Sequence, residues 1–282
     1  MAELSVLITG ASTGIGKATA LHMDKAGWRV FAGVRKEADA ERIDEESSDR
    51  MTPVIIDVTD QATIDATAEA VGAEVGSAGL DGLVNNAGIA VGGALEHLPL
   101  DDLRHQFEVN VFGQIAVTQA TLPLLRQAGG RIVFIGSLAG RVGMPLGGPY
   151  SGTKFALEGL SQSLRYELLS SGVGVSLVEP GAISSEIWEK GSTQVDEVKA
   201  QLSEEALERY APSIRAMEGF IDQGARTGIP AERVAEVVGH ALGSKSPRHR
   251  YLVGRDAKMF GNVARYAPDR VGVWAGKKLF KM

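Results

Sequence analysis

The sequence predicts an α/β fold: a single doubly wound domain in which a mostly parallel seven-stranded sheet lies between helices on both faces. Short apolar runs rich in β-branched residues alternate with longer segments of helical periodicity along the 282 residues. The runs are almost continuously apolar, as expected for parallel strands that are covered on both faces. Such alternation implies strands joined by right-handed crossovers, with helices above and below the sheet.

The individual elements follow from these runs and from the residues that separate them. We expect strands at Leu4–Thr9, Trp28–Val34, Thr52–Asp57, Leu80–Asn85, Arg131–Gly136, Val173–Glu179 and Tyr251–Val253. We expect helices at Gly14–Ala26, Ala38–Glu46, Gln61–Val75, Leu100–Gln127, Pro149–Ser170 and Ala231–Leu242. Gly27, Gly129 and Gly172 stand where three of these helices should end, just before the next strand. Pro123 should end or kink the fourth helix near its last turn.

One segment interrupts the alternation. Residues 180–229 are rich in Glu, Ser and Gly, and they lie between the sixth strand and the last long helix. Ligands of open α/β sheets bind at the carboxyl ends of the strands, where this segment begins. We therefore expect residues 1–282 to form one domain, in which 180–229 is an insertion that covers the substrate and 255–282 is a basic C-terminal tail.

Composition and charge limit the class of protein. The absence of cysteine excludes disulfides, a thiolate nucleophile and Cys-ligated metal sites. The net charge of −6 argues against general nucleic-acid binding. From Lys245 onward the chain contains ten Lys and Arg and two Asp, a net charge of +8, so the first 244 residues carry a net charge of −14. This basic end is either a solvated tail or a weak contact for a membrane surface or an acidic partner. Without a long apolar run or a secretion leader, we expect a cytoplasmic protein with no membrane span.

A glycine-rich turn follows the first strand and opens the first helix. Residues 9–16 read TGASTGIG, with Gly10 at the exit from the strand and Gly14 and Gly16 at the helix start. Glycines there let the backbone approach a pyrophosphate, and the helix N-terminus offers N–H groups and a positive dipole to the anion. The spacing differs from Gly-x-Gly-x-x-Gly, and no Gly-Lys-Ser/Thr of a P-loop follows. Its place in a strand–helix–strand series nevertheless indicates dinucleotide binding rather than a purely structural turn.

A tyrosine and a lysine are the main candidates for chemistry. Tyr150 and Lys154 are four residues apart at the start of an expected helix, so both project from one face. A phenol with a pKa of about 10 is a poor base, and a nearby ammonium group should lower that pKa by two or three units, to about 7 or 8. Ser137 lies just past the fifth strand, where a serine is most often a helix cap or a turn residue. Asn110 is a poor helix-interior residue, explained either by packing or by a functional amide.

Together these motifs resemble the classical short-chain dehydrogenases/reductases, and the resemblance extends from Thr9 to about Tyr251. Beyond the glycine turn, Asp57-Val58 resembles the adenine-side pair after strand three, residues 85–88 (NNAG) the signature after strand four, and Pro180-Gly181 the turn beside the nicotinamide. The resemblance implies the catalytic residues Asn110, Ser137, Tyr150 and Lys154. It implies the cofactor-binding residues Gly10, Ser12, Thr13, Gly14, Ile15, Gly16, Arg35, Asp57, Val58, Asn86, Ala87, Gly88, Tyr150, Lys154, Pro180, Gly181 and Ile183.

The resemblance also implies a role for each catalytic residue. Tyr150 exchanges a proton with the substrate oxygen, Ser137 holds that oxygen, and Lys154 supports the tyrosine. Asn110 relays protons through water to Lys154. No metal is implied, since the five histidines are scattered without a ligand pair at helical spacing.

The end of the second strand predicts the choice of cofactor. An acidic residue there would bind the adenosine ribose 2′-hydroxyl of NAD, whereas a basic residue accommodates the 2′-phosphate of NADP. Val34 occupies the place of the expected acid, and Arg35 offers a guanidinium to a phosphate. We therefore expect NADP, with NAD as the alternative if Arg35 and Lys36 only begin a solvated loop.

The substrate is predicted only by class. Residues 107–113 and 159–165 resemble the retinol and hydroxysteroid dehydrogenase branch, which implies an NAD(P)-dependent exchange between a lipophilic alcohol and its carbonyl. Large apolar residues that could line such a pocket are Met144, Leu146, Ile187, Trp188, Tyr210, Met217 and Phe220. They could equally be ordinary core residues.

Two other functions stay open at this point. One is a non-catalytic dinucleotide-binding sensor or scaffold; the other is different chemistry on the same fold, such as that of an epimerase, dehydratase or enoyl reductase. The complete set of Ser137, Tyr150 and Lys154 favours catalysis, because a pure binder needs only the glycine turn. Enoyl reductases of the family usually space tyrosine and lysine more widely. Apolar residues on more than one face of the helices at Leu100–Gln127 and Pro149–Ser170 predict a homodimer or homotetramer.

Overall fold

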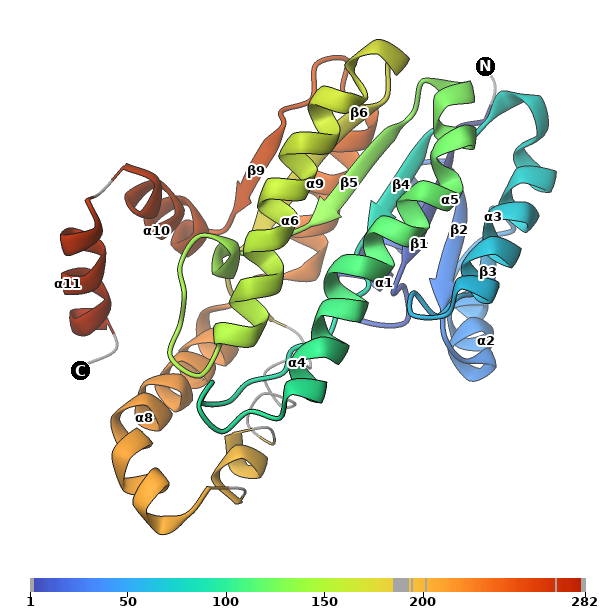
Figure 1. The fold of residues 1–282 in the computed structure, drawn as a ribbon. Helices are drawn as coiled ribbons and strands as arrows, with labels where there is room; N and C mark the ends of the chain where they lie inside the picture. The colour runs from blue at the N-terminus through green and yellow to red at the C-terminus, as the bar shows by residue number, and fades with distance from the viewer. Residues whose placement is uncertain (1–2, 185–192, 194, 201, 267, 280–282) are drawn as a thin grey trace.

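Seven parallel strands form one sheet in the order β3-β2-β1-β4-β5-β6-β9 in the computed structural model, which describes residues 3–184, 193, 195–200, 202–266 and 268–279 (Figure 1). The strands are β1 (Ser5–Thr9), β2 (Arg29–Val34), β3 (Met51–Ile55), β4 (Gly82–Asn85), β5 (Arg131–Ile135), β6 (Gly174–Pro180) and β9 (Arg250–Val253). Every neighbouring pair is parallel. Each strand agrees with its predicted run to within two residues at either end, so the predicted fold class is confirmed.

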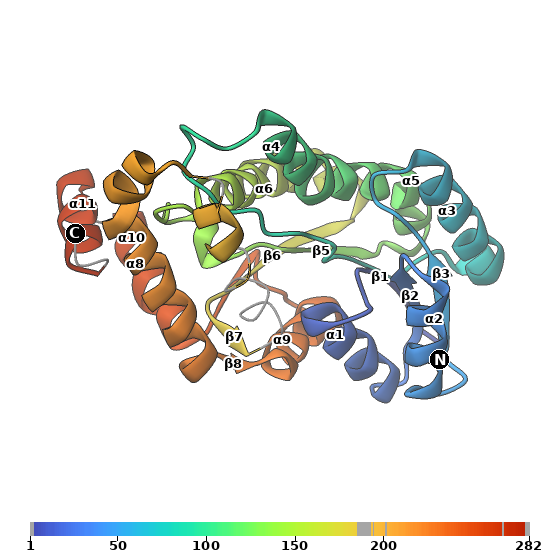
Figure 2. The same ribbon diagram turned by 90° about the horizontal axis from the view of Figure 1, so that it is seen from below.

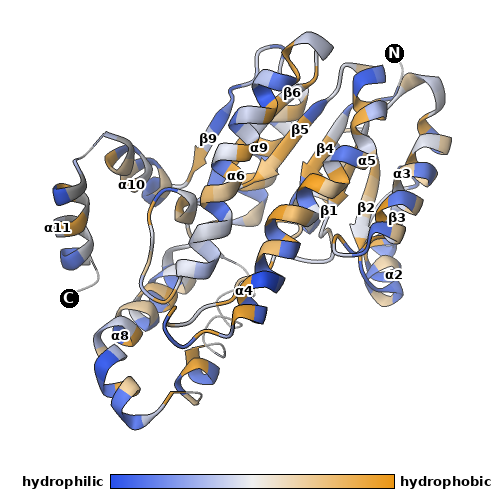
Figure 3. Ribbon diagram, viewed as in Figure 1, coloured by the Kyte–Doolittle hydropathy of each residue, from blue (hydrophilic) through white to orange (hydrophobic). Residues whose placement is uncertain are grey.

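Helices cover both faces of the sheet (Figure 2). One layer holds α1 (Gly14–Lys25), α2 (Glu37–Glu45) and α9 (Ala231–Gly243), and the other holds α3 (Gln61–Val75), α5 (Gly113–Ala128) and α6 (Gly148–Glu167). Along β1, Val6 and Ile8 belong to the core under the first layer, whereas Leu7 belongs to the core under the second. Because both faces are buried, most successive residues of the central strands are apolar, as the orange along β4 and β5 shows (Figure 3).

The helix expected at Leu100–Gln127 is divided in the structure. It consists of α4 (Leu100–Phe107), a π-helical turn at Glu108–Phe112, and α5, which continues past Pro123 to Ala128 instead of ending there. π-helical turns inside helices are often found at functional sites.

Three buried polar side chains project from this helix and its π turn onto one loop. Gln106 accepts a hydrogen bond from the backbone N–H of Val91. Asn110 Oδ1 accepts from Ile89 N at 2.8 Å, and its Nδ2 donates to Ile89 O at 2.8 Å. Gln114 Nε2 donates to Ala87 O at 2.9 Å. The side chain of Asn110 therefore braces the loop that follows β4, which is a packing reason for its position.

The segment expected to be an insertion contains a long helix. After the short strand β7 (Ile183–Ser184), α8 (Glu204–Thr227) is followed by the short strand β8 (Ile229–Pro230), which pairs with β7. The Oγ of Ser203 caps α8 by accepting a hydrogen bond from Ala206 N at 3.3 Å. Apolar residues at 210, 214, 217 and 221 recur at helical spacing, a signal that was available in the sequence.

The basic C-terminal segment is also helical. It forms α10 (Arg255–Tyr266) and α11 (Asp269–Leu279), and α11 lies away from the sheet (Figure 1). The first turns of α10 pack closely on the body of the protein, since Ala257 is fully buried. Among the described residues, no helix combines the length and the apolar character that a membrane crossing requires.

Candidate active site

A cleft of about 1490 Å³ lies at the carboxyl ends of the strands. All of the predicted cofactor-binding and catalytic residues line it except Gly16 and Asn110, which lie behind its wall. Single-ligand pockets commonly have volumes of about 300–1,000 Å³, so this cleft has room for a dinucleotide together with a second molecule. The residues come from segments far apart in the sequence, which the parallel sheet brings to one edge.

The glycine turn after β1 is shaped to approach an anion. Gly10 and Gly14 have φ values of 67° and 56°, which favour glycine. A Cβ on Gly16 would collide with the carbonyl oxygen of Gly10, whereas a Cβ on Gly14 would meet nothing within 4 Å. The turn is thus closed on its inner side and open at Gly14. The N-cap residue of α1, Thr13, makes no side-chain capping bond, so N–H groups of the first turn remain available to a phosphate.

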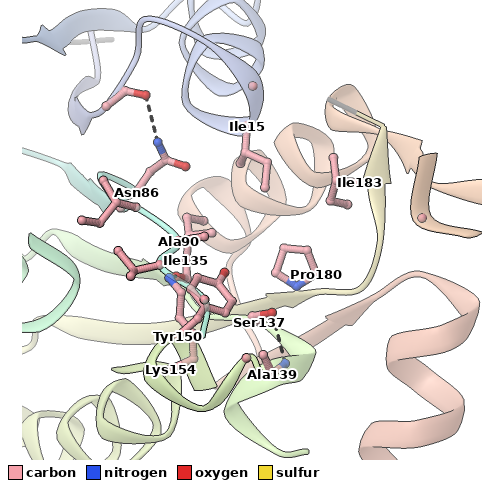
Figure 4. Close-up of a pocket in the computed structure, with 18 of the residues that line it drawn as sticks. Ile15, Asn86, Ala90, Ile135, Ser137, Ala139, Tyr150, Lys154, Pro180 and Ile183 are labelled. Carbon is pink, nitrogen blue, oxygen red and sulfur yellow. Dashed lines mark hydrogen bonds between the residues drawn. The ribbon is translucent and has the colours of Figure 1, made fainter. Parts of the chain in front are cut away.

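Asn86 holds this turn to the loop after β4. Its Nδ2 donates to Thr9 O at 2.9 Å and to Gly10 O at 3.0 Å. Figure 4 draws one of these bonds as a dashed line from Asn86. The Thr9 hydroxyl in turn accepts from the backbone N–H groups of Asn86 at 3.0 Å and Ala87 at 3.1 Å. The amide of Asn86 is therefore occupied within the protein.

Ser137, Tyr150 and Lys154 come together at the centre of the cleft (Figure 4). The hydroxyl of Ser137 lies close enough to that of Tyr150 to favour the ionised form of the phenol. Lys154 Nζ lies 5.5 Å from the centre of the Tyr150 ring and donates to Ile135 O, at the end of β5, at 2.8 Å. Ser137 also caps a short 3₁₀ turn, because its Oγ accepts from Ala139 N at 3.1 Å. The serine is thus both a cap and a partner of the tyrosine.

Burial shifts both titratable groups of this set toward their neutral forms. Burial raises the pKa of the Tyr150 phenol, and the nearby hydroxyl of Ser137 opposes part of that rise. Burial lowers the pKa of the Lys154 ammonium to about 8. The sequence predicted a lowered pKa for Tyr150, but burial raises it, because desolvation of the phenol outweighs the opposing influence of Ser137. At neutral pH the tyrosine is a proton donor and the lysine is charged.

The far end of the cleft carries the residues predicted to choose the cofactor. Val34 is buried at the end of β2, and Arg35 is exposed and lines the cleft. Arg35 makes no hydrogen bond or ion pair with the residues that the structure describes. The pKa of Asp57 is lowered mainly by the bond that its carboxylate accepts from the backbone N–H of Thr59, and in smaller part by the charge of Arg35. The guanidinium is thus available to a ligand.

The apolar residues proposed for the substrate pocket divide into three groups. Met144, Leu146, Met217 and Phe220 line the cleft. Tyr210 does not, and its hydroxyl bonds to Glu96 in the loop before α4. Ile187 and Trp188 lie outside the described residues.

Sequence reasoning missed the C-terminal wall of the cleft. Arg255, Asp256 and Phe260 line it, all from α10 in the segment expected to be a tail. One signal was available: Gly254-Arg255-Asp256 directly follows the last strand, at the same sheet edge as the other site residues.

Comparison with known proteins gives consistent matches over the whole chain. Residues 5–196 match the family model described as short chain dehydrogenase. The chain is 36% identical over 270 residues to the NADPH-dependent 3-dehydrocapnine reductase of Ornithobacterium rhinotracheale, with 94% of this chain and 93% of that protein covered. It is 37% identical over 284 residues to retinol dehydrogenase 7 of Mus musculus, with 97% and 89% covered. A solved short-chain dehydrogenase from Streptomyces avermitilis has a TM-score of 0.79 at 30% identity, with 100% of this chain and 98% of that chain covered.

Proposed function

The chain belongs to the short-chain dehydrogenase/reductase family, and from this premise we propose that it is an NADP-dependent enzyme that interconverts a lipophilic alcohol and its carbonyl. The family is one of oxidoreductases that use NAD or NADP. The observation that carries the proposal is the joined set of Ser137, Tyr150 and Lys154, open to a cleft that also contains the glycine turn. A non-catalytic sensor would need only the turn.

The chain's own residues provide orientation and proton transfer. The N–H groups at the start of α1 would hold the diphosphate, and the turn at Pro180–Ile183 would lie against the nicotinamide. When bound, the nicotinamide supplies or accepts the hydride. Ser137 would orient the substrate oxygen, and Tyr150 would donate a proton to it during reduction or remove one during oxidation. Lys154, charged below pH 8, would stabilise the phenolate that remains after donation.

The proposed substrate class is supported by the apolar part of the cleft lining. Met144, Leu146, Met217 and Phe220 present apolar surface there, and one relative is named as a retinol dehydrogenase. The test is a spectroscopic screen of lipophilic alcohols and ketones, with NADP(H) and NAD(H) added separately. Turnover of at least one pair by the wild-type protein supports the proposal, and cofactor binding without turnover of any substrate would favour the sensor.

Replacing Arg35 with Ala tests the proposed preference for NADP. A charge-assisted bond to the 2′-phosphate contributes about 1.5–3 kcal/mol, so the affinity for NADP should fall roughly ten- to a hundredfold. Affinity for NAD, which has no phosphate there, should change little. Dissociation constants are measured at fixed ionic strength, because salt screens the contact. Arg126→Ala, which removes an exposed cation on α5 outside the cleft, is the control. Equal losses for both cofactors, or a wild-type preference for NAD, would contradict the assignment.

We also propose that the protein is a homodimer or homotetramer. Large apolar side chains are exposed on α6, in the turn that follows it and in the turn before α5, namely Phe155, Leu160, Leu169 and Phe112. Covering such side chains with the same surface of a second copy would give a closed two-fold interface. Light scattering at micromolar concentration should report a mass of two or four chains. A mass of one chain would contradict the proposal.

A further inference from the structure

Helix α10 forms part of the active-site wall although it lies far along the chain from the other site residues. Asp256 and Phe260 line the cleft, and Ala257 between them is fully buried. A Cβ on Gly261 would lie 3.1 Å from Leu252 of β9, so the helix lies close against the last strand. The start of this helix is therefore fixed in place rather than solvated.

The carboxylate of Asp256 bonds directly to the turn after β6. Its Oδ2 accepts a hydrogen bond from the backbone N–H of Ala182 at 2.7 Å. A Cβ on Gly181 would collide with both carboxylate oxygens, and a Cβ on Gly254 would lie 2.5 Å from Oδ1. Gly254 has a φ of 111°, and Gly181 N donates to Val253 O at 2.9 Å. The carboxylate is thus enclosed by two glycines from different strand ends, and a side chain at Gly181 would displace it.

A second contact attaches α10 to the loop after β5, which contains Ser137. Arg141, four residues after Ser137, donates from Nη1 to Gly261 O at 3.2 Å. Its other nitrogens bind the Glu179 carboxylate at 2.6 and 2.9 Å, directly before Pro180. The helix is therefore held on one side through Asp256 to the turn and on the other through Arg141 to the strand that leads into it.

The turn that Asp256 holds lies beside the reacting groups. Pro180 and Ile183 line the same cleft as Ser137 and Tyr150 (Figure 4). The glycine turn that suits the diphosphate belongs to β1, three strands from β6 in the sheet order. A dinucleotide bound with its diphosphate at the glycine turn and its nicotinamide beside Tyr150 therefore has the nicotinamide against Pro180–Ile183. Its adenosine lies toward the other side of the cleft.

We propose that Asp256 is a positioning residue that fixes the turn Pro180–Ile183 against the nicotinamide half of the cofactor. The inference rests on the proposed function, since it requires a nicotinamide dinucleotide in the cleft. The carboxylate acts through the backbone of Gly181 and Ala182 and does not touch the reacting atoms. Helix α10 thereby contributes to how precisely the cofactor is held at its reactive end.

The test compares two ligands that share the adenosine half. In Asp256→Asn the side chain keeps its shape but loses the charge that strengthens its bond to Ala182 N–H. We expect NADPH affinity to fall about tenfold, with a larger fall for Asp256→Ala, which removes the acceptor altogether. The affinity for adenosine 2′,5′-bisphosphate, which lacks the nicotinamide, should stay within about twofold. Both dissociation constants are measured by calorimetry on the full chain. Asp101→Asn, at a carboxylate that is 92% exposed on α4, is the control.

Two other results would overturn the inference. Equal losses for both ligands in Asp256→Asn, accompanied by a lower melting temperature, would show that the residue only supports the fold. Unchanged affinities for both ligands in both variants would show that the turn needs no such support. If the wild-type protein binds the bisphosphate but not NADPH, or neither ligand, the proposed function itself fails, and that result is visible before any variant is made.

Discussion

Replacing Tyr150 with Phe is expected to lower the turnover number by about 10²–10⁴-fold while cofactor affinity stays unchanged. The change removes the hydroxyl that lies beside Ser137 and leaves the aromatic ring that borders Lys154. The measurement is steady-state kinetics on a confirmed substrate, with the dissociation constant of NADPH determined separately.

The pH dependence of alcohol oxidation gives a second readout of the same residue. Oxidation needs the phenolate, and burial raises the pKa of Tyr150, so the phenol is mostly protonated at neutral pH. The wild-type rate should therefore rise with pH, by up to about tenfold per unit between pH 6 and pH 7, where Lys154 is mostly charged. The rate of the Phe variant should not rise in this way, because it has no phenol to titrate.

Tyr166→Phe is the matched control for these experiments. Tyr166 lies on the same helix, is 63% exposed, and lies outside the cleft lining. Removing the Tyr166 hydroxyl should leave both the turnover number and the pH profile unchanged. Near-normal turnover in Tyr150→Phe, or the same pH profile in that variant as in the wild type, would show that another group transfers the proton.

The sheet could be predicted because its strands carry a strong local signal. Both faces of the strands are buried, so residues such as Val6, Leu7 and Ile8 are apolar in succession. The glycine turn could be predicted for a similar reason, since the positive φ values of Gly10 and Gly14 and the crowding at Gly16 favour or require glycine. These are constraints within a few residues of chain, and a sequence shows them directly.

The parts that could not be predicted depend on contacts between distant segments. The side chain of Asn110 braces Ile89, twenty-one residues earlier, and the π-helical turn that contains it interrupts a continuous helical pattern. Asp256 bonds to Ala182, seventy-four residues away, and its neighbours gave only the pattern of a charged tail. The raised pKa of Tyr150 likewise follows from its desolvation in the folded chain. Residue types alone indicated only that an ammonium lay nearby.

Replacing Arg141 with Met is expected to destabilise the protein by about 3–5 kcal/mol, because it removes one partner of a buried ion pair. The side chain of Arg141 is 9% exposed and that of Glu179 is fully buried. Arg250 lies 2.9 Å from the same carboxylate and also pairs with Glu158, so it offsets only part of the loss. Denaturant unfolding at pH 8 measures the change. Arg209→Met, at an exposed ion pair with Glu205, should change stability by no more than about 1 kcal/mol.

The loss of stability in Arg141→Met should depend on pH, and it should be larger at higher pH. Burial raises the pKa of Glu179 to about 7, above the usual 4.5 that it has when unfolded. A carboxyl with a raised pKa favours folding when protonated, and that contribution is lost as the pH rises through the folded-state value. Without Arg141 the pKa of Glu179 rises further. The stability of the variant therefore continues to fall as the pH rises above 7, whereas this contribution to the stability of the wild type is already lost by then. The difference between the two proteins should therefore be larger at pH 8 than at pH 6. A difference below about 1 kcal/mol, or one that is equal at both pH values, would show that the carboxylate does not depend on Arg141 for its charge.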